Sequence, residues 1–315
     1  MAMDSQQLLL GIFYALIFPG FLFTAVLGLL LVWVDRKVTA VVQSRVGPPW
    51  FQPFADIGKL LAKRMIVPRG SKAIGFLAAP LLAVAGATLA AVIVLRAILN
   101  PSPGFVGDLI VLIYLSALPS IALVIGGASS RSPFGAIGAG REMSMILSYE
   151  LGFLLAIITV LVKAHSILLG DIVSYQVAHG PIIGSLSGVI AFVVAMYAMQ
   201  AKLGYLPFDI AEADTELIGG PLAEYSGSGL ALFKLSQAMT FVYLPAWMAL
   251  LFLGGIEPTA LSLFFFLLKF LALLVIIIVV KITHARLRLD QALRLFWGKV
   301  LIAAAIAVVL ALIGL

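Results

Sequence analysis

Eight long runs of apolar residues dominate this chain of 315 residues. A helix needs roughly 20 apolar residues to cross the hydrocarbon core of a bilayer, and helices satisfy their own backbone hydrogen bonds there. The sequence therefore predicts an all-α integral membrane protein, a bundle of about eight transmembrane helices with long cytoplasmic loops. Pro19 and Gly20 interrupt the first run, which a membrane helix tolerates. The runs cover about residues 8–34, 73–99, 108–127, 143–163, 181–200, 238–255, 258–281 and 298–315.

Composition excludes several kinds of site. Hydrophobic residues make up 63% of the chain and charged residues 11%, whereas soluble domains carry roughly 25% charged residues. The chain has no cysteine, and its three histidines (His165, His179 and His284) do not have metal-ligand spacing. We therefore expect no metal, iron–sulfur cluster or other cofactor bound by this chain. The pI near 9.6 reflects membrane topology signals rather than a nucleic-acid partner.

The positive charges fall on one side of the predicted bundle. Seventeen of the 20 lysines and arginines lie in or beside the loops 35–72, 128–142, 201–237 and 282–297, whereas Arg96 and Lys163 lie on the other side. By the positive-inside rule the long loops are cytoplasmic and both termini are outside. The chain thus reads as one polytopic domain, residues 1–315, in the cell membrane.

Acidic residues gather in the loop 201–237, which holds five of the 14 in the chain. They are Asp209, Glu212, Asp214, Glu216 and Glu224. On a helix, Asp209, Glu212 and Glu216 would share one face. Like charges held close together raise one another's pKa when partly dehydrated, which makes them proton carriers. A solvated acidic face is the alternative.

Three further charges fall within or beside apolar runs. Glu142 opens the fourth span, Glu150 lies roughly 12 Å further along the helix axis, and Lys269 is near the middle of the seventh span. Each such charge costs about 2.5 kcal/mol or more in a bilayer, so intramembrane charges mark ion paths. The alternative is a structural salt bridge in which Lys269 pairs with a carboxylate.

Two basic segments are candidate docking surfaces. The loop 35–72 opens with Asp35-Arg36-Lys37, and its later part has the pattern of a surface helix at the membrane interface. It would serve either as a topology anchor or as a surface for a cytoplasmic partner. In the segment 285–299, Arg286, Asp290 and Arg294 recur every four residues, and structural and docking roles are not separable there.

Four stretches of these loops, taken in order, resemble the subunit 1 family of respiratory complex I (the NADH–quinone oxidoreductase H subunit) and its homologues in membrane-bound nickel–iron hydrogenases. Lys269 also has a counterpart in that family. The four stretches are Asp35-Arg36-Lys37 to Gln43, Arg45-Val46-Gly47-Pro48, Ala55-Asp56 and Lys59-Leu60; Arg141 with Ser148-Tyr149-Glu150; Pro207-Phe208-Asp209 through Glu212, Glu216-Leu217 and Glu224-Tyr225-Ser226-Gly227; and Arg286-Leu287-Arg288 with Asp290-Gln291.

The resemblance implies a joint between a peripheral redox arm and an ion-pumping membrane arm. The implied proton path and coupling residues are Glu142, Glu150, Asp209, Glu212, Asp214, Glu216, Glu224 and Lys269. The implied peripheral-arm docking residues are Asp35, Arg36, Lys37, Gln43, Arg45, Asp56, Lys59, Arg141, Arg286, Arg288, Asp290 and Arg294. No residue of this chain is expected to be catalytic.

Three departures from the complex I pattern favour one branch of the family. The loop between Gly47-Pro48 and Ala55-Asp56 is short, Tyr205 stands where complex I members usually have arginine, and Asp35 replaces the usual glutamate. The chain therefore resembles the anchor of a group 4 hydrogenase, a ferredoxin-linked complex that moves protons or sodium ions.

That branch implies particular partners. They are large and small peripheral subunits, which contain the nickel–iron (NiFe) centre and the iron–sulfur clusters, and antiporter-like membrane subunits. The alternatives are a quinone-chamber subunit of complex I and a subunit of a related sulfur-reducing complex. A stand-alone transporter is disfavoured because the sequence shows no inverted repeat.

Overall fold

The computed structural model describes residues 5–100, 104–105, 107–257 and 259–315, the side chains of residues 5–9, 214 and 215 excepted. All regular secondary structure in this part of the chain is helical. The α-helices are α1 (Ser5–Leu16), α2 (Phe21–Val42), α3 (Gln52–Ala62), α4 (Ala73–Leu99), α5 (Asp108–Ser129), α6 (Pro133–Ala164), α7 (Leu169–His179), α8 (Leu186–Lys202), α9 (Asp214–Leu217), α10 (Gly227–Phe252), α11 (Ala260–Thr283), α12 (Leu289–Arg294) and α13 (Leu301–Ile313).

The predicted membrane-spanning runs are all helices. Among the described residues, seven helical stretches are long and apolar enough to cross a bilayer, and the predicted span 181–200 corresponds to the shorter apolar helix α8. A π-helical turn, Leu295–Val300, joins α12 and α13 into one of the seven stretches, Leu289–Ile313. The predicted all-α membrane bundle is confirmed.

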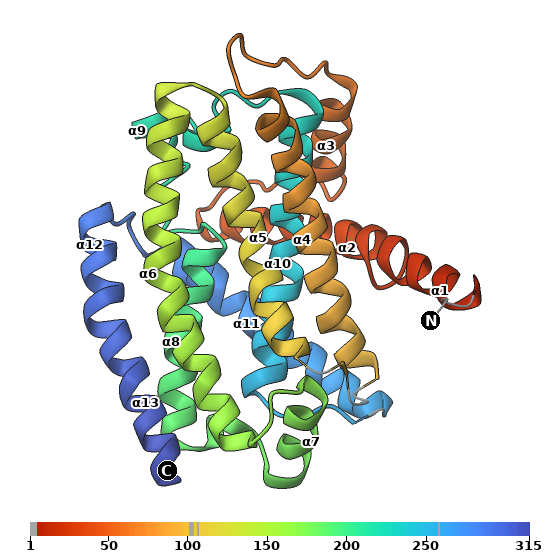
Figure 1. Cartoon of the computed structure of the whole chain (residues 1–315), viewed down its shortest axis with the longest axis vertical. Helices are drawn as coiled ribbons and strands as arrows, with labels where there is room; N and C mark the ends of the chain where they lie inside the picture. Colours follow the sequence, from red (N-terminus) through yellow and green to blue (C-terminus); the bar gives the residue numbers. More distant parts are fainter. Residues whose placement is uncertain (1–4, 101–103, 106, 258) are drawn as a thin grey trace.

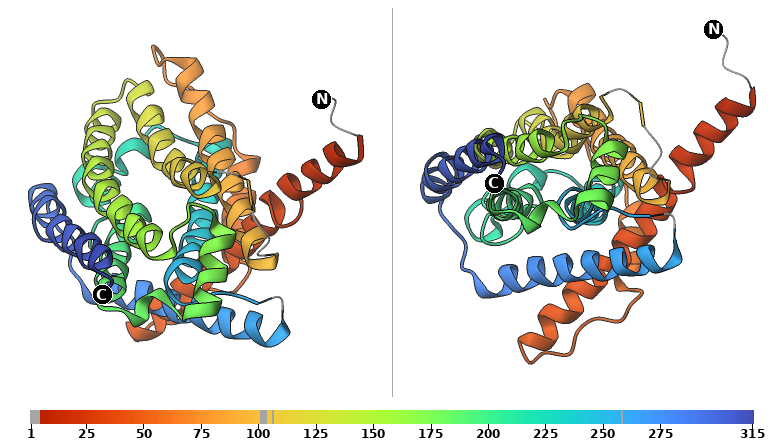
Figure 2. Two further views of the ribbon diagram at one scale, coloured as in Figure 1. Left: turned by 60° about the horizontal axis from the view of Figure 1, so that its bottom comes forward. Right: turned by 90° about the horizontal axis from the view of Figure 1, so that it is seen from below.

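Helix α10 forms the centre of this bundle. Its apolar window is 89% buried, whereas those of the other long helices are between 28% and 56% buried. Helices α4, α5, α6, α8 and α13 run along the long axis around α10 (Figure 1), while α1–α2 and α11 cross at a steep angle (Figure 2). Every residue from Ala238 to Phe252 is buried.

Small residues allow the helices to approach closely. A Cβ atom at Gly28 of α2 would lie 2.5 Å from the carbonyl oxygen of Ala238 in α10, and one at Gly86 of α4 would lie 2.5 Å from Leu118 Cβ in α5. Apolar surface gains little by leaving lipid, so membrane helices associate through such close van der Waals packing. These contacts fix α2, α4, α5 and α10 as one unit.

The boundaries of three predicted segments were wrong. The first run is two helices, since α1 ends at Leu16 and α2 begins at Phe21, after Pro19-Gly20. Most of the predicted loop 128–142 belongs to α6, because Pro133 at its start has the backbone angle of a first helical turn. The predicted loop 282–297 shrinks to residues 284–288, because α12 begins at Leu289; the Gln291 side chain accepts a hydrogen bond from the Arg288 amide at 3.1 Å.

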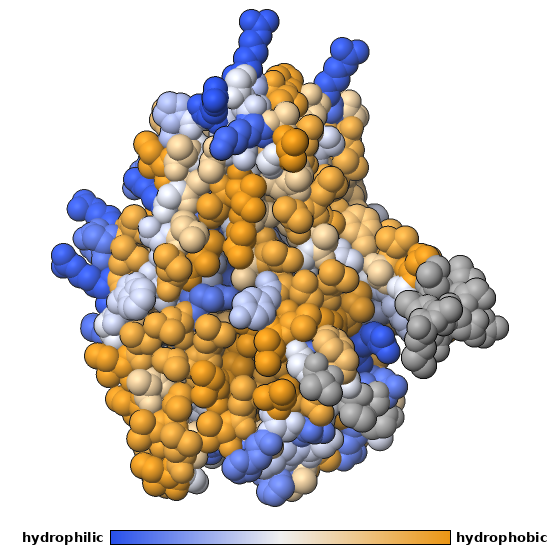
Figure 3. Space-filling model, in the orientation of Figure 1, coloured by the Kyte–Doolittle hydropathy of each residue, from blue (hydrophilic) through white to orange (hydrophobic). Residues whose placement is uncertain are grey.

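The long connections gather at one end of the bundle. Helices α3 and α9 lie at the top of Figure 1, and α7 lies at the bottom with the C-terminus. Apolar side chains cover most of the surface between these ends, while hydrophilic residues gather at the ends and along one edge beside α12 (Figure 3). This distribution matches a bundle that crosses a membrane along its long axis.

Candidate functional site

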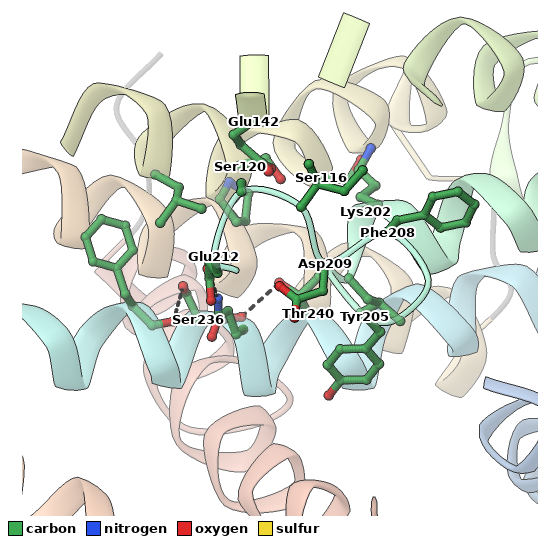
Figure 4. Close-up of a pocket in the computed structure, with 18 residues that line it drawn as sticks. Ser116, Ser120, Glu142, Lys202, Tyr205, Phe208, Asp209, Glu212, Ser236 and Thr240 are labelled. Carbon is green, nitrogen blue, oxygen red and sulfur yellow. Dashed lines mark hydrogen bonds between the residues drawn. The ribbon is translucent and has the colours of Figure 1, made fainter. Parts of the chain in front are cut away.

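A polar cavity lies where α5, α6 and α10 meet the connection 203–213. It has a volume of about 110 Å³, which is room for several water molecules. The carboxyl groups of Glu142, Asp209 and Glu212 line it, and Glu142 lies beside Ser120 (Figure 4). Hydroxyl groups complete the walls, from Ser116 and Ser120 of α5 and from Ser236 and Thr240 of α10. Such a set of groups can hold water in a chain of hydrogen bonds.

A buried ion pair lies next to this cavity. The Nζ atom of Lys202, at the end of α8, is 3.0 and 2.9 Å from the two carboxylate oxygens of Glu150 in α6. The Lys202 side chain is 1% exposed and that of Glu150 is 18% exposed. Lys202 also lies 4.8 Å from the ring centroid of Phe153. Because Lys202 lines the cavity as well, it connects Glu150 to the acids around the cavity.

The acids of the predicted loop 201–237 do not share a helical face. Residues 209–213 form no helix, and α9 begins only at Asp214, so the prediction of one helix carrying Asp209, Glu212 and Glu216 was wrong. Each acid instead has a partner on a different element, which separates like charges. Asp209 binds Arg286 at 2.6 Å, Glu212 accepts from Gln237 at 2.8 Å, and Glu216 binds Arg141 at 2.5 Å.

A second cavity, about 320 Å³ in volume, opens on the surface beside Asp209 and brings several predicted docking residues together. It is lined by Arg141, Glu216, Arg286, Arg288 and Asp290, which come from α6, α9, α12 and the segment before α12. The hydrogen bond from Arg141 lowers the pKa of Glu216 below its ordinary value. Three arginines and two acids thus form one charged surface, here called the arginine pocket.

Asp35 does not lie on this or any other exposed surface. Its residue is 3% exposed, and its carboxylate binds the Lys281 ammonium of α11 at 2.6 Å. Lys281 also lies 4.6 Å from the ring centroid of Tyr205, and burial raises the pKa of Tyr205. Asp35 therefore ties α2 to α11 and to a wall of the polar cavity.

The rest of the first basic segment is exposed or half-buried. Arg36 binds Asp56 of α3 at 2.9 Å, and this hydrogen bond is the main cause of a lowered Asp56 pKa. Gln52 donates a second hydrogen bond to Asp56 at 2.9 Å. The predicted surface helix is thus α3, held against the end of α2. Gln43, Arg45 and Lys59 are exposed, and Lys37 is half-buried.

The remaining predicted site residues are not near the cavity. Lys269 is half-buried in α11, where its Nζ would lie 3.1 Å from a Cβ atom at Gly254. The ion pairs found among the described residues do not include it. Glu224 and Arg294 are exposed. The side chain of Asp214 lies outside the described residues.

Two lysines have roles that the sequence analysis did not assign to them. Lys202 and Lys281 were counted only as topology signals, yet both form ion pairs with acids of the predicted site. Their positions at the cytoplasmic ends of apolar runs carried a signal, since a lysine there can reach back toward an intramembrane acid. Nothing in the sequence indicated which acid each would reach.

Comparisons with known proteins agree with this architecture. A family model described as NADH dehydrogenase matches residues 14–312. The NADH-quinone oxidoreductase H subunit of Thermomicrobium roseum is 34% identical over 329 residues, covering 96% of this chain and 95% of that protein. An H subunit of the same enzyme from Syntrophobacter fumaroxidans, numbered 2 in that organism, is 37% identical over 295 residues, covering 88% and 87%.

A solved structure is also similar over nearly the whole chain. It is a chain of the membrane-bound sulfane sulfur reductase, an archaeal respiratory membrane complex, with a TM-score of 0.85 and 29% identity, covering 96% of this chain and 99% of that one. The relatives are thus subunits of membrane oxidoreductase complexes. This chain is therefore a multi-pass membrane subunit that belongs to the NADH dehydrogenase family, the family of complex I subunit 1 and of the NADH-quinone oxidoreductase H subunits.

Proposed function

We propose that this chain anchors peripheral redox subunits and couples their chemistry to the movement of protons or sodium ions. The observation that carries the proposal is the position of the Glu150–Lys202 pair, which lies inside the bundle and beside a cavity lined by three carboxyl groups. Redox chemistry in the peripheral subunits would change the charge near Asp209 and Glu212. Water and hydroxyl groups in the cavity would pass that change to Glu142 and to the buried pair.

The arginine pocket supports the anchoring part of this role. It opens at the end of the bundle that holds the long connections, and Arg286 binds Asp209 at 2.6 Å. A peripheral subunit that contacts Arg288 or Arg141 would therefore sit two side chains away from the cavity. Because charge effects fall off with distance and water screening, this short route suits electrostatic coupling.

We further propose that the complex is of the hydrogenase or sulfane-reductase type, with a ferredoxin as electron donor. The polar cavity of about 110 Å³ is smaller than the roughly 300–1,000 Å³ of pockets that hold small organic ligands. Tyr205 adds to this, since it packs against Phe241 and Lys281 in the cavity wall. The likeness to a sulfane sulfur reductase chain favours the same branch.

A quinone-reducing complex is the second candidate. It is favoured by the relatives named as H subunits of NADH-quinone oxidoreductases, which are 34% and 37% identical. The two candidates differ in the electron acceptor. The purified complex, supplied with reduced ferredoxin, should evolve hydrogen or reduce a sulfane compound without added quinone. Activity that requires a quinone, and that a quinone-site inhibitor abolishes, would decide for the second candidate.

Coupling is tested by Glu150→Gln in the purified complex, reconstituted into liposomes. We expect electron transfer from an artificial donor near the wild-type rate, but an ion gradient reduced at least several-fold, measured with a pH-sensitive and a sodium-sensitive dye. Glu257→Gln is the matched control, because Glu257 is an exposed acid at the opposite end of α10. An unchanged ratio of ions to electrons in Glu150→Gln would refute the coupling role of this residue.

A further inference from the structure

A groove with an entirely apolar lining lies at the end of the bundle opposite the arginine pocket. It has a volume of about 460 Å³, within the size range of ligand pockets. Its walls come from four places: Phe18 and Phe23 around the start of α2, Leu95 and Leu99 of α4, Ala246 of α10, and the first half of α11. Figure 2 shows these elements meeting where α11 begins.

The groove meets the lipid of the membrane, not water. Leu263, Phe264 and Leu267 of α11 line it and are all exposed, and α11 is among the most apolar membrane-spanning helices described. A lipid acyl chain is therefore the occupant that its lining fits. Lining alone does not distinguish one lipid from another.

A positive charge stands at one end of the groove. Arg96 of α4 is exposed and lies between the lining residues Leu95 and Leu99 in the sequence. Its guanidinium carbon lies 4.8 Å from the ring centroid of Tyr14, four residues before the lining residue Phe18. Arginine and tyrosine near a helix end commonly sit at the depth of lipid headgroups.

The Arg96 guanidinium is available to an external anion. The ion pairs of the described residues do not include Arg96. Asp108, which lines a neighbouring cavity with Arg96, instead accepts hydrogen bonds from the amides of Leu109 at 2.7 Å and Leu169 at 3.1 Å. A guanidinium binds phosphate through two parallel hydrogen bonds, which a phospholipid headgroup can supply.

We propose that the groove and Arg96 form a binding site for one anionic phospholipid. An acyl chain would occupy the apolar groove, and the headgroup phosphate would bind Arg96 beside Tyr14. The site is at the end predicted to face outside, where Arg96 and Lys163 are the basic residues counted from the sequence. The bound lipid would fill the space between α2, α4 and α11 and brace the steep crossing of α2.

Native mass spectrometry of the purified complex tests the proposal, with phosphatidylglycerol and phosphatidylcholine of the same chain length as probes. We expect one phosphatidylglycerol to be retained more tightly than phosphatidylcholine. Arg96→Gln should weaken that binding about tenfold, the effect of losing a charge-assisted hydrogen bond. Leu263→Trp should weaken both lipids, since it fills the groove.

Matched variants separate the site from general effects. Lys163→Gln removes the other basic residue of that end, and Leu312→Trp enlarges an exposed leucine of α13 far from the groove; neither should change lipid retention. Equal retention of the two lipids in wild type would overturn the anionic-headgroup part. Unchanged binding in Leu263→Trp would overturn the acyl-chain part, and displacement of the bound lipid by inorganic phosphate would point to a simple anion site.

Discussion

The Lys202 ammonium lies 3.0 and 2.9 Å from the two carboxylate oxygens of Glu150, so one cation contacts both oxygens of one acid. The pair joins α8 to α6 inside the bundle. Breaking a buried pair by removing one partner leaves an uncompensated charge, which costs more than the pair contributes when intact. The stability and the coupling role of this pair can therefore be separated by experiment.

Lys202→Met should destabilise the protein and impair coupling. We expect a loss of about 3 kcal/mol in the free energy of unfolding, because the Glu150 carboxylate keeps its charge without a partner. The unfolding midpoint in a fixed detergent measures this change, and the ion gradient in liposomes measures coupling. Lys234→Met is the control, since Lys234 is exposed on α10. A midpoint equal to that of the control would contradict the prediction.

The double variant Glu150→Gln with Lys202→Met should be more stable than Lys202→Met alone. Removing both charges leaves no unpaired ion, so the two substitutions are not additive. A double-mutant cycle on unfolding midpoints gives the interaction energy directly. Ion translocation should still fail in the double variant, because the titratable acid is absent. Strict additivity of the two single effects would mean that the residues act independently.

How much of this site the sequence predicted depends on the kind of interaction. The spans followed from apolar run length, and Glu150 from the cost of a charge in lipid, because both signals are local. The partners of Glu150 and Asp35 did not, since Lys202 and Lys281 reach them only after distant helices pack together. The acids at 209–216 matched a helical spacing, but their pairing with Arg286, Gln237 and Arg141 determines their actual places.

Acid should loosen α3 from the end of α2. The hydrogen bond from Arg36 lowers the Asp56 pKa from its ordinary value near 3.8, so the charged carboxylate stabilises the folded state above that value. The contribution is lost as the pH falls through the lowered pKa. Because the Asp56 side chain is 35% exposed, the effect should be at most about 1 kcal/mol. Amide hydrogen exchange of α3 measures it, and Asp56→Asn should exchange fast without this acid dependence.

Arg288→Gln should weaken the attachment of the peripheral subunits. Arg288 is exposed in the arginine pocket, and a charge at an interface acts mainly on association and its salt dependence. We expect less peripheral subunit to co-purify, and a smaller loss on raising salt than in wild type. Lys299→Gln is the control, because Lys299 is an exposed basic residue outside the pocket. Wild-type yield and salt dependence in Arg288→Gln would exclude this surface from docking.

Ser116→Leu should slow ion translocation while sparing electron transfer. Ser116 lines the polar cavity and its hydroxyl bonds the Ile113 carbonyl at 2.7 Å, so leucine would take the place of water without removing a charge. A cavity of about 110 Å³ holds only a few waters, and losing one or two interrupts a hydrogen-bonded chain. Ser144→Leu in α6 is the control, since Ser144 does not line the cavity. The ratio of ions moved to electrons transferred is the measurement: a several-fold fall in Ser116→Leu, with no change in Ser144→Leu, is the expected result. Equal ratios in the two variants would mean that ions do not pass through this cavity.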